Sequence, residues 1–246
     1  MAASERVQKA LARAGLASRR EADRWVAEGR VRINGEPAQP GAQVQIQDTV
    51  TVDGRSVDLG AAFPATRVLA YHKPEGELCA RSDPEGRPTI FDQLPDPAVG
   101  RWIQVGRLDL NTSGLILLTT DGDLAHGLMH PSRQVEREYA VRVRGEPDRD
   151  TRQKLRQGVT LEDGPARFLQ VEPTKANGRN AGLRVTLGEG RKREVRRLLE
   201  AVGHPVSRLK RIRFGPVALP RDLKPGQWRE LDAATVAELR RAAGLG

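Results

Sequence analysis

The sequence predicts an α+β protein in which a small amino-terminal domain precedes a larger domain, built on a largely antiparallel mixed sheet flanked by helices. Its 246 residues suffice for two hydrophobic cores of unequal size. Apolar segments typical of strands outnumber helical segments, without the regular β-α-β order of a parallel sheet. Residues 59–66 are mostly small and include a proline. We therefore predict domains over residues 4–58 and 67–243, with a linker at 59–66.

The first 29 residues predict two short helices. Ser4 is placed to cap the first helix, and Gly15 to end it in the left-handed conformation. Ser18 and Glu21 spell a capping box for the second helix, which is expected to end at Gly29. Apolar side chains recur at helical spacing, so each helix is expected to bury one face: Val7, Leu11 and Ala14 in the first, Ala22, Trp25 and Val26 in the second.

Short alternating strands are predicted next, at residues 31–33, 44–46 and 50–52. The dipeptide Asn34-Gly35 after the first of them is the strongest short signal for a tight hairpin. A further turn at Asp53-Gly54 closes the unit. Two helices packed on a small curl of strands are therefore expected.

This order of elements, with the run SRREADRWVAEGRVRINGEPAQPGAQV, resembles the S4 RNA-binding module from Ser4 to about Val57. The resemblance implies that basic side chains on the outer face of the helices bind RNA. These are Lys9, Arg13, Arg19, Arg20 and Arg24. The alternative is that they only solvate two amphipathic helices.

The larger domain is predicted to hold most of the strands. They are expected at residues 68–71, 103–105, 115–118, 139–143, 166–171 and 183–187. Helices are predicted at 124–129, 150–157, 193–202 and 233–242, the last capped by Asp232 and closed by Gly244.

Charge and composition limit the class of partner. Lysine and arginine number 41 against 32 acidic residues, and the formal net charge of +9 favours a polyanion such as nucleic acid, although arginine can also reflect overall composition. The single cysteine, Cys79, excludes an intrachain disulfide and a multi-thiolate metal site. No segment approaches the roughly 20 apolar residues of a membrane span. We expect a cytoplasmic monomer without a membrane partner.

The most unusual stretch is GRLDLNTSGLILLTTDG, residues 106–122, in which a polar loop enters a continuous apolar strand. Asp109 therefore lies on a loop braced by a buried element, which suits catalysis. Taken alone, an aspartate among Asn, Thr, Ser and Gly is more often a turn former. The whole stretch, however, resembles the central motif of the pseudouridine synthases. By that resemblance Asp109 is the catalytic residue, and Arg107 helps to displace the target nucleotide from its stack.

Two further segments resemble motifs of the same family. Residues 136–141, EREYAV, match the motif whose tyrosine packs on the target uracil, which assigns that role to Tyr139. Residues 188–198, GEGRKREVRRL, match the motif whose arginine pairs with the catalytic carboxylate. This places Arg196 beside Asp109, where its charge would keep the carboxylate ionised. Ordinary strand packing for the tyrosine and general phosphate binding for the arginine helix are the alternatives.

Other segments resemble the branch of the family that modifies ribosomal RNA. They are His72 to Gly76, Met129 to Ser132 and Ser207 to Gly215, and the resemblance extends to about Ala242. KPEGELCARSDPEGRPTIFDQLP and ALPRDLKPGQWREL resemble the large-subunit members. Further RNA-binding candidates are Arg191, Lys192, Arg193, Arg197, Arg208 and Lys210.

The resemblance implies a uridine of 23S rRNA as substrate, in naked RNA or in an assembly intermediate of the large subunit. The isomerisation involves no redox change and needs no cofactor. The alternatives are the same chemistry on 16S rRNA, a non-catalytic S4-bearing assembly factor and, more remotely, a DNA-binding regulator. His126 and His130 have a spacing that metal ligands can share, but no third ligand cluster accompanies them, so no metal site is predicted.

Overall fold

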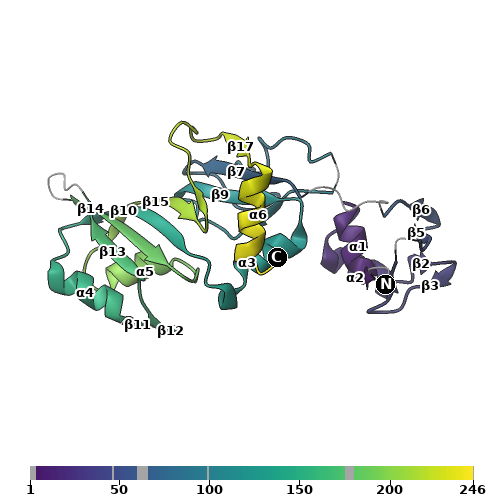
Figure 1. The fold of residues 1–246 in the computed structure, drawn as a ribbon, viewed down its shortest axis with the longest axis horizontal. Coiled ribbons are helices and arrows are strands. Elements are labelled where there is room, and N and C mark those ends of the chain that lie inside the picture. Colours follow the sequence, from purple (N-terminus) through teal and green to yellow (C-terminus); the bar gives the residue numbers. More distant parts are fainter. Residues whose placement is uncertain (1–3, 46, 60–65, 99, 175–179, 246) are drawn as a thin grey trace. The chain divides into compact units, whose positions relative to one another are not determined.

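A computed structural model describes residues 4–45, 47–59, 66–98, 100–174 and 180–245 (Figure 1). The chain divides into two compact units. The first holds the residues up to Arg67 together with 96–103 and 120–122, and the second holds the rest. Except for its two end residues, the predicted linker at 59–66 lies outside the described residues, and the predicted domain boundaries stay a prediction.

The first unit contains the helices α1 (Val7–Arg13) and α2 (Arg19–Ala27), whose apolar faces enclose a small core. Ser18 caps α2 by accepting a hydrogen bond from the Glu21 amide at 3.1 Å, as predicted. The predicted cap at Ser4 is wrong. Helix α1 begins after Arg6, because β1 (Glu5–Arg6) is held extended by pairing with β4 (Gln43–Val44).

A four-stranded sheet of order β3-β2-β5-β6 completes the first unit. Its strands are β2 (Val31–Ile33), β3 (Glu36–Pro37), β5 (Val50–Val52) and β6 (Arg55–Val57). The hairpin predicted at Asn34-Gly35 joins β2 to β3, and both residues have positive φ, at 51° and 90°. Two successive positive φ angles match the right-handed twist of the strands that a two-residue turn connects.

The second unit is built on a nine-stranded mixed sheet of order β13-β14-β10-β15-β9-β7-β17, in which β8 pairs with β9 and β16 with β15. The strands before residue 150 are β7 (Val68–Lys73), β8 (Ile103–Val105), β9 (Ser113–Thr119) and β10 (Arg137–Arg144). Those after it are β13 (Gln170–Pro173), β14 (Asn180–Leu187), β15 (Val206–Phe214), β16 (Val217–Ala218) and β17 (Trp228–Glu230). The pairing of β15 with β9 is parallel, and the other pairings along this order are antiparallel, which confirms the predicted fold class.

Helices and a short 3-10 turn accompany this sheet. They are α3 (Gly122–Met129), η1 (Pro131–Arg133), α4 (Arg149–Gln157), α5 (Glu194–Glu200) and α6 (Ala233–Ala242). Helix α4 packs on β13 and α5 on β15 (Figure 1). Asp232 caps α6 as predicted. No helix in the described part of the chain is long and apolar enough to cross a membrane.

One strand prediction needs correction, and one long strand was missed. The strand expected at 166–171 is divided between β12 (Gly164–Ala166), which forms a separate hairpin with β11 (Val159–Leu161), and β13. Strand β15 was not predicted, although it links the two halves of the sheet. In its sequence, VSRLKRIRF, the adjacent basic residues Lys210 and Arg211 interrupt the alternation of basic and apolar side chains, and Arg211 is fully buried.

Candidate active site

The loop that carries Asp109 connects β8 to β9 and is held through its backbone carbonyls. Lys73, at the end of β7, is fully buried. Its ammonium donates to the carbonyl oxygens of Thr112 at 2.9 Å and Leu110 at 3.4 Å, and also to Pro74. The Gly76 amide donates to the Leu110 carbonyl as well, at 2.9 Å. Several donors therefore fix the backbone immediately after Asp109.

A lysine without exposed surface is costly unless its charge is compensated. Burial lowers the pKa of Lys73, and the thiol of Cys79 and the carboxylates of Glu77, Glu75 and Asp109 act in the opposite direction. Carbonyl dipoles and neighbouring acidic groups thus replace the water that this ammonium has lost. Lys73 belongs to the scaffold of the loop that carries Asp109, a role that sequence reasoning did not single out.

Arg196 reaches the same loop from α5, with only 5% of its surface exposed. Its guanidinium donates to the Asn111 carbonyl at 2.9 Å and to the Val206 carbonyl at 3.2 Å. Burial and Arg193 lower the pKa of Arg196, whereas the charge of Asp109 raises it. No Asp109–Arg196 ion pair within 4 Å occurs among the described residues, and the hydrogen bonds of the Arg196 guanidinium go to the backbone of the loop and of β15.

Tyr139 lies on β10 and is 8% exposed. It pairs across the sheet with Arg211 of β15, which in turn pairs with Gly114 of β9. With neighbouring strands about 4.8 Å apart, the backbones of Tyr139 and Gly114 are about 10 Å apart. Because Gly114 directly follows Ser113 at the end of the loop, the register brings the tyrosine strand close to the loop of Asp109.

The close approach of β15 to β9 depends on Gly114. This residue has a φ of 110°, and a Cβ at this position would lie 2.6 Å from the Arg211 amide nitrogen. Arg211 fastens the junction, because its Nε donates to the Leu115 carbonyl at 2.7 Å. The guanidinium groups of Arg211 and Arg137 both lie 5.2 Å from the ring centroid of Phe214. Sequence reasoning missed Arg211, because a cation in an alternating strand is usually exposed.

The remaining predicted residues differ in how available they are to RNA. Arg107 is exposed on the loop. In the first unit, Arg13 is bound to Glu5 at 2.7 Å, with Lys9 4.0 Å from the same carboxylate, and the exposed arginines of α2 are Arg19, Arg20 and Arg24. In the second unit, Arg197 pairs with Asp163 at 2.8 Å and Arg191 with Glu189 at 3.0 Å. Lys192 and Arg193 are exposed, as is Arg208, and Lys210 is half-buried.

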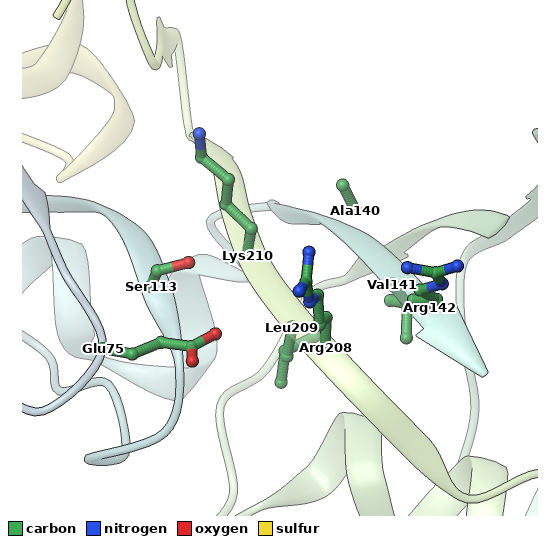
Figure 2. Close-up of a pocket in the computed structure, with 8 residues that line it drawn as sticks. All are labelled: Glu75, Ser113, Ala140, Val141, Arg142, Arg208, Leu209 and Lys210. Atoms are coloured by element: carbon green, nitrogen blue, oxygen red, sulfur yellow. The ribbon is translucent and has the colours of Figure 1, made fainter. Parts of the chain in front are cut away.

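A pocket of about 400 Å³ opens in the second unit (Figure 2). Ser113 at the start of β9 and Glu75 line one side of it, and residues of β10 and β15 line the other. Asp109, Tyr139 and Arg196 are not among its lining residues.

The described residues contain no group of three or more histidine, cysteine, aspartate or glutamate side chains that could hold a metal ion. The two histidines with the suggestive spacing make other contacts. His126 and His130 lie edge to face with ring centroids 5.5 Å apart, and His130 Nδ1 lies 2.7 Å from the Ser132 hydroxyl.

Comparisons with known proteins match both parts of the chain. A family model described as RNA pseudouridylate synthase matches residues 67–201, and an S4 domain model matches residues 5–50. The ribosomal large subunit pseudouridine synthase B of Escherichia coli O6:H1 is 54% identical over 245 residues, which cover 98% of this chain and 84% of that relative. The protein of the same name from Pseudomonas aeruginosa is 53% identical, and the match covers 98% of this chain but 63% of the relative. A crystal structure of a pseudouridylate synthase superposes with a TM-score of 0.66 at 26% identity, covering 95% of this chain and 99% of that one.

Proposed function

Because the chain belongs to the RNA pseudouridylate synthase family, a family of isomerases, we propose that it converts one uridine of 23S ribosomal RNA into pseudouridine, with Asp109 as the catalytic carboxylate. The observation that carries this proposal is that hydrogen bonds hold the backbone of the loop that contains Asp109. Lys73 and Arg196 hold three consecutive carbonyls, those of Leu110, Asn111 and Thr112. Such a scaffold keeps a reacting group in place without reorganisation during the reaction.

The chemistry requires one carboxylate and no external group. The bond between uracil N1 and ribose C1′ breaks, the base turns, and C5 bonds to C1′. C5 loses its hydrogen and N1 gains one, so atoms and electrons balance without a cofactor. Asp109 can either attack the ribose or base covalently or remove a ribose proton to give a glycal, and both routes suit its position on the loop.

The other predicted residues act on the nucleotide or on the loop. The target base must leave its stack to reach a carboxylate inside the fold. We assign Arg107, which is exposed, to the displacement of the nucleotide, and Tyr139 to stacking on the uracil. Arg196 positions Asp109 through the Asn111 carbonyl and adds a positive charge near the carboxylate.

The choice of large-subunit RNA follows the names of the relatives that match nearly the whole chain. The S4 domain and the net charge of +9 supply affinity for RNA without base identity. We expect the substrate to be naked 23S rRNA or an assembly intermediate, because the mature subunit would bury the uridine. We also expect the enzyme to act as a monomer in the cytoplasm, where ribosomes assemble.

Sequence-resolved mapping of pseudouridine tests the substrate. Separate 23S and 16S rRNA transcripts are incubated with the purified protein and no added cofactor. We expect one new pseudouridine in the 23S transcript and none in the 16S transcript. A new site in 16S rRNA alone would overturn the choice of subunit, and modification of neither transcript nor of RNA from assembling subunits would favour the assembly-factor alternative.

A further inference from the structure

The half of the sheet formed by β14, β10 and β15 exposes one of its faces. Along β10 the side chains alternate, with Arg137, Tyr139, Val141 and Val143 buried. On the other face Ala140 is exposed although β10 has a neighbour on both sides. Because the side chain of Ala140 is small, a ligand can approach this face of the sheet closely.

The pocket of about 400 Å³ described above opens on this face, and Ala140 is one of its lining residues. Its lining residues are Glu75, Ser113, Ala140, Val141, Arg142, Arg208, Leu209 and Lys210. Lys210 pairs with Ala140 and Arg208 with Arg142 in the antiparallel ladder, so the three cationic side chains project from one face of two adjacent strands (Figure 2). All these residues belong to the second unit.

These three cations have no partner within the described part of the chain. The side chains of Arg142, Arg208 and Lys210 make neither a hydrogen bond nor an ion pair there. Two other arginines of the sheet are neutralised: Arg213 donates to Glu138 at 2.9 Å, and Arg184 lies 3.3 Å from the same carboxylate. The fold therefore provides counterions elsewhere and leaves the pocket cations unpaired.

The residues that line the pocket consequently carry a net positive charge. Among the described residues that line it, Glu75 is the only acidic one, against three cations. Like charges held on neighbouring strands repel each other, and an anion placed between them would relieve that repulsion. The volume of about 400 Å³ is within the range of small-ligand pockets.

We propose that this pocket binds a phosphodiester group of the RNA, at a nucleotide close to the target uridine, through Arg142, Arg208 and Lys210. The inference rests on the proposed function. Ser113 lines the pocket and follows Asp109 by four residues, a distance of at most about 14 Å along the chain. A phosphate held here fixes the register of the RNA strand relative to Asp109, and it carries no base identity of its own.

Binding measured in a catalytically inactive background tests the proposal. In protein carrying Asp109→Asn, the additional substitutions Arg142→Gln, Arg208→Gln and Lys210→Gln are made one at a time. The matched control is Arg156→Gln, which removes an exposed charge from α4. Affinity for the 23S rRNA transcript is measured by filter binding from 50 to 200 mM salt. Melting temperatures of all variants verify that each is folded.

We expect each pocket variant to raise the Kd about five- to tenfold at low salt, and to reduce the slope of log K against log salt by at most about 0.9, the value for the one phosphate contact that the three cations share. The control is expected to bind as its parent does.

Unchanged affinity and salt slope in all three pocket variants would overturn the proposal, as would an equal loss in the Arg156→Gln control. Competition by inorganic phosphate in place of RNA, with no effect of the substitutions on RNA binding, would assign the pocket to a free anion. If wild-type protein modifies no rRNA while the pocket variants still lose affinity, the proposed function fails and the phosphate site stands.

Discussion

At the scale of single residues, the candidate site depends on buried cations that donate hydrogen bonds to backbone carbonyls. Lys73 and Arg196 are both almost fully buried, and both use their donors on carbonyls of residues 110–112. Asp109 and Tyr139 were identified in the sequence because whole motifs resemble those of a family. The use of Lys73 could not be predicted, because only the folded chain brings its ammonium to carbonyls nearly forty residues away.

Replacement of Lys73 by methionine tests the role of this ammonium. The change keeps the length of the side chain but leaves the Thr112 carbonyl without its lysine donor, and a buried acceptor without a partner costs about 1 to 3 kcal/mol of unfolding free energy. We expect kcat to fall about a hundredfold, since small displacements of a catalytic group have effects of this size. Affinity for RNA should be unchanged, because Lys73 is buried.

The measurements are single-turnover pseudouridylation and urea denaturation, with Lys224→Met as the control. Lys224 is exposed, so its replacement should change neither quantity. A kcat within twofold of wild type for Lys73→Met would show that the loop is positioned without this lysine.

At the scale of elements, the sequence predicted the helices, strands and turns whose signals lie in neighbouring residues. The hairpin at Asn34-Gly35 and the caps of α2 and α6 depend on adjacent residues, and they are present as predicted. Strand β15 was missed because its arginines occupy both faces, and Arg211 is buried only through its contacts with β9 and Phe214. The cap at Ser4 failed because pairing between β1 and β4, distant in sequence, decides where α1 begins.

Helix α5 contains a carboxyl group that should make stability depend on pH. Glu194 is 2% exposed at the first position of the helix, and its carboxylate accepts from the Arg191 amide at 3.0 Å. Burial raises the pKa of Glu194 to about 7, and its hydrogen bond with Glu189 contributes in the same direction. The folded state therefore favours the protonated form. The resulting stabilisation is fully present below the ordinary value of 4.5 and is lost as pH rises through about 7.

We expect the unfolding free energy of wild-type protein to fall by about 1 to 3 kcal/mol between pH 5 and pH 8 relative to Glu194→Gln. Urea denaturation at a series of pH values measures this difference. The control is Glu200→Gln, at the exposed end of the same helix. Parallel pH profiles for wild type and Glu194→Gln would contradict the assigned titration.

At the scale of the whole molecule, the chain divides into two compact units. The expectation of an S4 domain followed by a catalytic domain is confirmed by the family matches. The inclusion of residues 96–103 and 120–122 in the first unit could not be predicted, because it depends on contacts between segments far apart in sequence. Charge was informative for the class of partner, but the pairing of each arginine depends on the fold. Arg13, Arg191 and Arg197 are neutralised by nearby carboxylates, whereas the pocket cations are not.

The most direct test of the central claim compares Asp109→Asn with wild type and with Asp150→Asn, a matched change of an exposed aspartate on α4. Each protein is assayed for binding to 23S rRNA and for formation of pseudouridine without added cofactor. We predict that Asp109→Asn binds RNA as wild type does but forms no pseudouridine, whereas Asp150→Asn retains both properties. Pseudouridine formation by Asp109→Asn at a rate near that of wild type would contradict the assignment of this carboxylate to catalysis.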